Sequence, residues 1–110
     1  MTRNQLIRDT RRLIAEGERL QLQPTMEALR TWLALSDSLL SQAWGSMDRY
    51  HLAWLMVGKS VLAPRGRPMT ETETSAYVRD VAEQKTAALR MSLKAVDEQN
   101  MPFLGETPVT

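Results

Sequence analysis

The chain has 110 residues, of which 43% are hydrophobic and 25% charged, and its formal net charge is +1. A chain of this length corresponds to one domain that can bury a core without disulfides. Its lack of cysteine excludes a disulfide framework and thiolate metal sites. It contains no run of about 18 apolar residues, and the start "MTRNQLIRDTRR" is too polar for a signal peptide. We therefore expect a soluble, cytoplasmic protein without a membrane-spanning segment.

The first two helices are predicted from apolar residues that recur with a period of 3.6. The first covers residues 3–20 and ends before Pro24, which lacks a backbone donor and restricts the residue before it. The second covers residues 25–44 and has the broad apolar stripe of a core-facing helix. Gly45 follows it and can adopt the left-handed conformation that closes a helix.

The third helix is predicted over residues 47–62 and is apolar nearly all round. Ser46 is expected to cap it, with Asp48 in its first turn near the positive end of the helix dipole. Gly58 lies within the apolar stripe and would allow a neighbouring helix to approach closely. A helix with two apolar faces is buried between its neighbours or meets a second chain.

The fourth helix is predicted over residues 70–99. Thr70 and Glu73 have the spacing of a capping box, in which a hydroxyl and a carboxylate satisfy backbone donors reciprocally. Lys85 falls within the apolar stripe, and we expect its stem to extend to the rim. The two prolines and the glycine of residues 101–110 cannot continue a helix.

The predicted fold is all-α, a compact bundle of four helices with short connections and an irregular C-terminal tail. Residues 1–100 form one helical domain, and residues 101–110 form a flexible tail. Aromatic side chains concentrate in the middle of the chain, where they are expected to form the core rather than a ligand pocket. They are Trp32, Trp44, Tyr50 and Trp54.

The segment "PRGRP" resembles the core of the AT-hook, a short DNA-binding element. The resemblance implies that Arg65 and Arg67 enter the minor groove of A·T-rich DNA and that Gly66 allows close approach. A narrow minor groove attracts arginine through its enhanced negative potential. The simpler interpretation is a connection in which Pro64 ends one helix and Pro68 admits the next. Binding of nucleic acid through this loop is the alternative function.

The single histidine, His51, lies on the apolar stripe of the third helix, one turn after Asp48. Acid–base catalysis would require such a pair to lie in a cleft. One histidine without cysteine forms no recognisable metal cluster. We interpret His51 as a core or interface residue and expect no enzyme activity, cofactor or metal.

The uneven distribution of charge along the chain and the apolar residues on the back of the third helix favour a function in protein–protein interaction. Residues 1–68 carry 10 basic and 6 acidic side chains, and residues 69–110 carry 4 basic and 7 acidic ones, an asymmetry that can guide association. Arg8, Arg12 and Arg19 share one face of the first helix, which we interpret as solvated. Leu52 and Met56, beside Arg49, occupy the back of the third helix. These three residues are the predicted interface of a non-catalytic regulator or adaptor that forms a homodimer or binds another protein.

Overall fold

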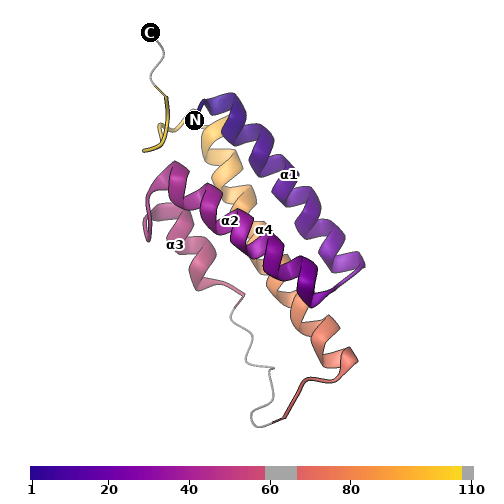
Figure 1. The fold of residues 1–110 in the computed structure, drawn as a ribbon. Coiled ribbons are helices and arrows are strands. Elements are labelled where there is room, and N and C mark those ends of the chain that lie inside the picture. The colour runs from indigo at the N-terminus through magenta and orange to yellow at the C-terminus, as the bar shows by residue number, and fades with distance from the viewer. Residues whose placement is uncertain (59–66, 108–110) are drawn as a thin grey trace.

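A computed structural model describes residues 1–58 and 67–107 (Figure 1). Residues 59–66 and 108–110 lie outside the described part of the chain. Four helices, and no strand, are present in the described residues, which confirms the predicted all-α class. They are α1 (Arg3–Leu22), α2 (Met26–Trp44), α3 (Arg49–Met56) and α4 (Glu71–Asp97).

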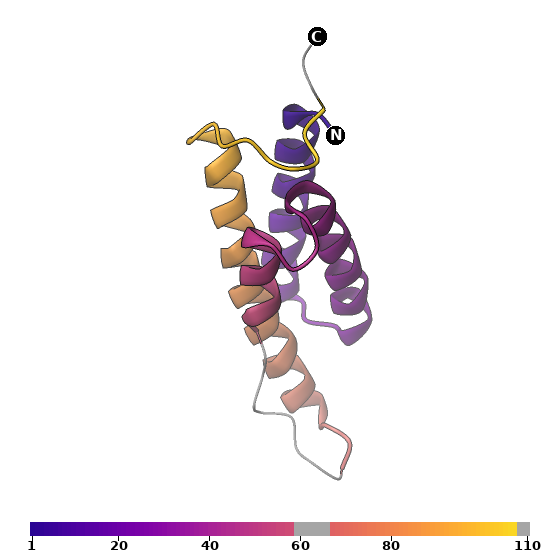
Figure 2. The same ribbon diagram turned by 90° about the vertical axis from the view of Figure 1, so that its left-hand side faces the viewer.

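The two longest helices, α1 and α4, pack along each other, and α2 packs against both (Figures 1 and 2). The short α3 lies against α2 and α4 rather than against α1. The N-terminus and the C-terminal segment up to residue 107 meet at one end of the bundle, where the Met1 ammonium donates to the Gly105 carbonyl at 2.8 Å. Apolar residues of all four helices and the tail form one core.

Three helices begin where a hydroxyl can cap them. Thr2 accepts a hydrogen bond from the Gln5 amide, and the Gln5 side chain in turn accepts one from the Thr2 amide. Thr25 accepts from the Ala28 amide at the start of α2. At α4, Thr70 and Glu73 form the predicted capping box. Each hydroxyl satisfies a donor that the first turn of a helix leaves unpaired.

The third helix covers Arg49–Met56, which corrects the predicted bounds of 47–62 at residues 47, 48, 57 and 58. Residues 59–62 of that prediction lie outside the described residues. Met47 has φ +64°, outside the helical region, so the helix starts later. Asp48, rather than Ser46, is the cap and accepts from the Arg49 amide at 2.9 Å. At the other end the helix stops at Met56, because Val57 is extended (φ −101°, ψ 163°) and Gly58 has φ +72°. A Cβ at Gly58 would lie 3.3 Å from Lys85 Cγ, which confirms the expected close approach to a neighbouring helix.

The three long helices meet most closely at Gly17 of α1. A Cβ there would collide with the Thr86 hydroxyl of α4 and would lie 2.8 Å from the Trp32 ring of α2. The Trp32 indole N–H donates to the Leu13 carbonyl at 2.8 Å, which holds the ring against α1. Glycine is therefore required at this position by space.

The predicted aromatic centre is confirmed as core. Trp32, Trp44 and Trp54 are each buried, and Trp44 contacts Tyr50 edge to face at a centroid distance of 4.7 Å. Lys85 does not extend to the rim as expected. Its side chain is 8% exposed, and Nζ donates to the Trp54 carbonyl at 2.6 Å while it lies over the Trp54 ring. Carbonyl and ring together offset part of the cost of burying the ammonium.

The C-terminal segment is irregular, as predicted, and packs on the bundle up to residue 107. Phe103 is buried, and the Gly105 amide donates to the Ala43 carbonyl at 2.9 Å. Arg3 forms an ion pair with Glu106 at 3.1 Å. The flexibility expected for residues 101–110 stays a prediction, although Phe103 and these bonds anchor part of the segment.

We predict that Gly17→Ala destabilises the fold, although alanine is the better helix former by roughly 1 kcal/mol. Forcing a methyl group between Thr86 and Trp32 overpacks the core and should lower the free energy of unfolding by about 1–3 kcal/mol. Urea denaturation of the purified variant measures this change.

The matched control is Ala15→Gly at an exposed position of α1, which should lose about 1 kcal/mol through helix propensity alone. The double variant Gly17→Ala/Thr86→Ala should lose less than the sum of its two single variants, because truncation of Thr86 makes room. Additive losses would contradict the proposed collision.

Candidate functional site

The predicted interface residues lie together on the outer face of α3. Leu52 is 38% exposed and Met56 is 63% exposed, one helical turn further along. Arg49 is exposed at the start of the same helix, and its guanidinium lies 3.1 Å from the sulfur of Met101. We refer to Arg49, Leu52 and Met56 as the α3 face. None of its apolar side chains is withdrawn into the core.

A hollow of about 490 Å³ adjoins the α3 face where the α2–α3 corner meets the C-terminal segment. Asp48 and Arg49 contribute opposite charges to its lining, and exposed Leu104 contributes an apolar side chain. The remaining lining residues are Trp44, Met101, Pro102 and Phe103. Sequence reasoning missed the part contributed by the tail, although the apolar Phe103 and Leu104 within it were a signal.

His51 is buried, with 4% of its surface exposed, and both ring nitrogens have partners. Nδ1 accepts from the Met47 amide at 2.8 Å, so the neutral ring carries its proton on Nε2. Nε2 lies against a carboxylate oxygen of Asp37 on α2. The carboxylate that pairs with the ring is therefore Asp37 and not Asp48, the possible partner considered from the sequence.

The local backbone gives His51 a structural role. Non-glycine residues rarely adopt positive φ, yet Met47 has φ +64° and Arg49 has φ +34° in this corner. The bond from the Met47 amide to the ring holds the corner, and the bond to Asp37 attaches it to α2. With both nitrogens engaged and the ring stacked on Trp54, neither nitrogen is free to contact a substrate.

The AT-hook-like loop is described only in part. Arg65 and Gly66 lie outside the described residues. Arg67 forms a two-pronged ion pair with Glu73, with distances of 2.8 and 3.1 Å. This hydrogen bond, assisted by bonds from Thr70, lowers the pKa of Glu73 from its ordinary value of 4.5 to about 2. Arg67 is therefore engaged with an acid of this chain.

Residues 1–58 and 67–107 contain neither a candidate metal site nor a helix that could span a membrane. No three His, Asp or Glu side chains there lie close enough together to hold a metal ion. No helix there is long and apolar enough to cross a membrane. The expectation that the protein needs no cofactor or metal stays a prediction.

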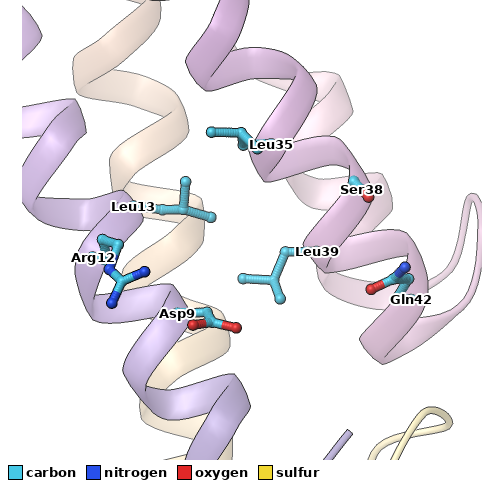
Figure 3. A pocket seen from close by; sticks show the side chains of 7 residues that line it. All are labelled: Asp9, Arg12, Leu13, Leu35, Ser38, Leu39 and Gln42. Atoms are coloured by element: carbon cyan, nitrogen blue, oxygen red, sulfur yellow. The ribbon is translucent and has the colours of Figure 1, made fainter.

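A second hollow, of about 310 Å³, lies between α1 and α2 (Figure 3). Its apolar lining consists of Leu13, Leu35 and Leu39, and its polar lining of Asp9, Arg12, Ser38 and Gln42. We call it the α1/α2 groove. From the sequence, Arg12 was interpreted as part of a solvated face of the first helix, and no contact between this face and α2 was predicted.

No family model, curated protein or solved structure matches this chain.

We predict that the two bonds of His51 stabilise the α2–α3 corner. His51→Phe removes both and leaves the Met47 amide unpaired, so the free energy of unfolding should fall by about 1–3 kcal/mol. His51→Asn retains an acceptor close to the position of Nδ1 and should lose less. Urea denaturation compares the two variants, and a smaller loss for phenylalanine than for asparagine would contradict this role.

We predict that the Arg67–Glu73 ion pair at the start of α4 makes the free energy of unfolding depend on pH. The pKa of Glu73 is lower in the folded protein than in the unfolded chain. The ion pair therefore contributes its full stabilisation of the fold above about pH 4.5, and this stabilisation is lost as the pH falls through about 2. Arg67→Gln should raise the titration midpoint of the Glu73 carboxyl toward 4.5, as followed by carbon-13 NMR. Arg79→Gln, elsewhere on α4, should leave it unchanged. An identical midpoint in the wild type and Arg67→Gln would contradict the assignment.

Proposed function

We propose that this protein is a non-catalytic interaction protein that self-associates through the α3 face. The observation that carries the proposal is the exposure of Leu52 and Met56, one turn apart, on a helix whose opposite side is packed in the core. Clustered apolar side chains on an outer surface favour association. The engagement of both nitrogens of His51 supports a non-catalytic role.

A second copy of the chain is the partner that the charges favour. Asp48 and Arg49 stand side by side at the edge of the α3 face. In a twofold dimer each surface meets its own copy, so Asp48 of one chain can pair with Arg49 of the other in both directions. The adjoining hollow, whose lining includes Phe103 and Leu104, offers a recess for the exposed Met56 of the other copy. Protein interfaces commonly have an apolar centre surrounded by polar residues of complementary charge, and the α3 face has this arrangement.

The pairing of Arg67 with Glu73 supports protein association over DNA binding. A guanidinium held by a carboxylate of its own chain must break that pair before it can enter a minor groove. Binding of nucleic acid by the Arg65–Arg67 segment stays a prediction from the sequence. The lack of cysteine is consistent with a reducing compartment and supports the proposal of a cytoplasmic location.

We expect light scattering coupled to gel filtration to give a dimeric mass for the wild-type protein. Leu52→Ser/Met56→Ser should raise the dissociation constant by about tenfold or more, because loss of two central apolar anchors costs roughly 1.4 kcal/mol or more. Arg49→Glu should weaken the dimer as well, since it places two like charges opposite each other.

The matched control is Leu22→Ser/Met91→Ser, which replaces exposed apolar residues on α1 and α4 and should leave the dimer intact. Circular dichroism checks that every variant keeps its helix content. A wild-type protein that is monomeric at all concentrations would overturn self-association. A dimer unaffected by the α3 variants would overturn the assignment of the interface.

A further inference from the structure

The α1/α2 groove combines an apolar floor with polar groups at its edges. Leu13 and Leu39 are nearly buried beneath it, and Leu35 is 56% exposed along its wall. Figure 3 shows these three side chains in the space between the two helices, with Arg12 and Asp9 on the α1 side. Its volume of about 310 Å³ is at the small end of the roughly 300–1,000 Å³ typical of ligand pockets.

Arg12 is the unusual member of this lining. Most arginines of the described chain have an ion pair or hydrogen bond, such as Arg11 with Asp97 at 2.9 Å and Arg90 with Glu18 at 2.7 Å. Arg12 has neither with any residue of 1–58 and 67–107, although it lies at the groove. The side chain of Gln42, on the opposite wall, likewise makes no hydrogen bond within these residues. The groove thus has an unpaired cation and an unpaired amide above three leucines.

We propose that the α1/α2 groove binds a single-chain amphiphile with an anionic head, of the class of an alkyl carboxylate. The alkyl chain lies on Leu13, Leu35 and Leu39, and the carboxylate accepts hydrogen bonds from the Arg12 guanidinium. Arginine suits this role because its donors match the two oxygens of a carboxylate. Asp9 on the same wall forms an ion pair with Arg8, at 3.7 Å.

An alkyl chain fits this groove better than a peptide does. The groove runs between two helices whose backbone groups are bonded within each helix, so it offers no free backbone edge to an extended peptide. The N–H and C=O groups of such a peptide would be buried with few partners, which is unfavourable. An alkyl chain requires no partner along its length. The site lies away from α3, so this inference does not depend on the proposed dimer.

Sodium decanoate is the probe for this site, added to the full-length wild-type protein below its micelle-forming concentration. Nitrogen-15 NMR should show saturable shifts centred on residues of α1 and α2 beside the groove. Decanol has the same alkyl chain with an uncharged head group and tests whether the carboxylate is needed for binding. Decyltrimethylammonium has a cationic head group and tests whether the negative charge is needed. A short peptide that ends in leucine with a free carboxylate tests the alternative ligand, which is the C-terminus of a protein.

Arg12→Gln should weaken decanoate binding by about tenfold, the effect of losing one hydrogen bond to a charged group. The control is Arg30→Gln, which removes an exposed arginine outside the groove lining and should leave affinity unchanged. Leu35→Ser should weaken binding, whereas Leu22→Ser should not. Both leucines are exposed, so neither change should unfold the protein.

Three results would overturn the proposal. The first is decanol or decyltrimethylammonium binding as tightly as decanoate, because the head group would then not be recognised. The second is an equal effect of Arg12→Gln and Arg30→Gln, which indicates nonspecific attraction to positive charge. The third is tighter binding of the leucine-terminated peptide, which would assign the groove to a protein segment.

Discussion

The crossing of α1, α2 and α4 at Gly17 is the constraint on which the rest of the bundle depends. The absent side chain lets the Thr86 hydroxyl and the Trp32 ring approach α1, and the Trp32 N–H fixes the ring by bonding to the Leu13 carbonyl. Packed interiors tolerate little change of volume, so this contact sets the spacing of all three helices. Exposed ion pairs such as Arg11–Asp97 follow from that spacing and contribute little stability themselves.

This packing leaves two different surfaces open. The short α3 covers α2 and α4, and its own outer side keeps Leu52 and Met56 in contact with solvent. The groove on the other side lies between α1 and α2 and keeps Leu35 and Arg12 accessible. The two surfaces differ in chemistry: one has adjacent charges of opposite sign suited to its own copy, and the other has an unpaired cation above leucines. Partner binding and ligand binding can therefore be tested by separate variants.

Local features of the fold were predicted well because their causes are local. The Thr70–Glu73 capping box involves four consecutive residues, and its hydrogen bonds form wherever that turn is helical. The length of α3 was predicted poorly for the opposite reason. Its apolar period continues past Gly58, but the helix ends at Met56, because Val57 is extended and Gly58 follows it with φ +72° against Lys85. The partner of His51 was also missed, since Asp37 lies on another helix and the rotation of α2 brings it to the ring.

The sequence by itself determined the helical class, most helix boundaries and the residues whose apolar side chains had no obvious place in the core. Helical periodicity and capping depend on residues close together along the chain, so both can be identified from a single sequence. Tertiary structure alone decided that Lys85 is buried against the Trp54 ring and that Arg12 lines a groove with three leucines. Such contacts depend on the relative rotation and spacing of helices, which close packing at Gly17 sets and no local pattern encodes.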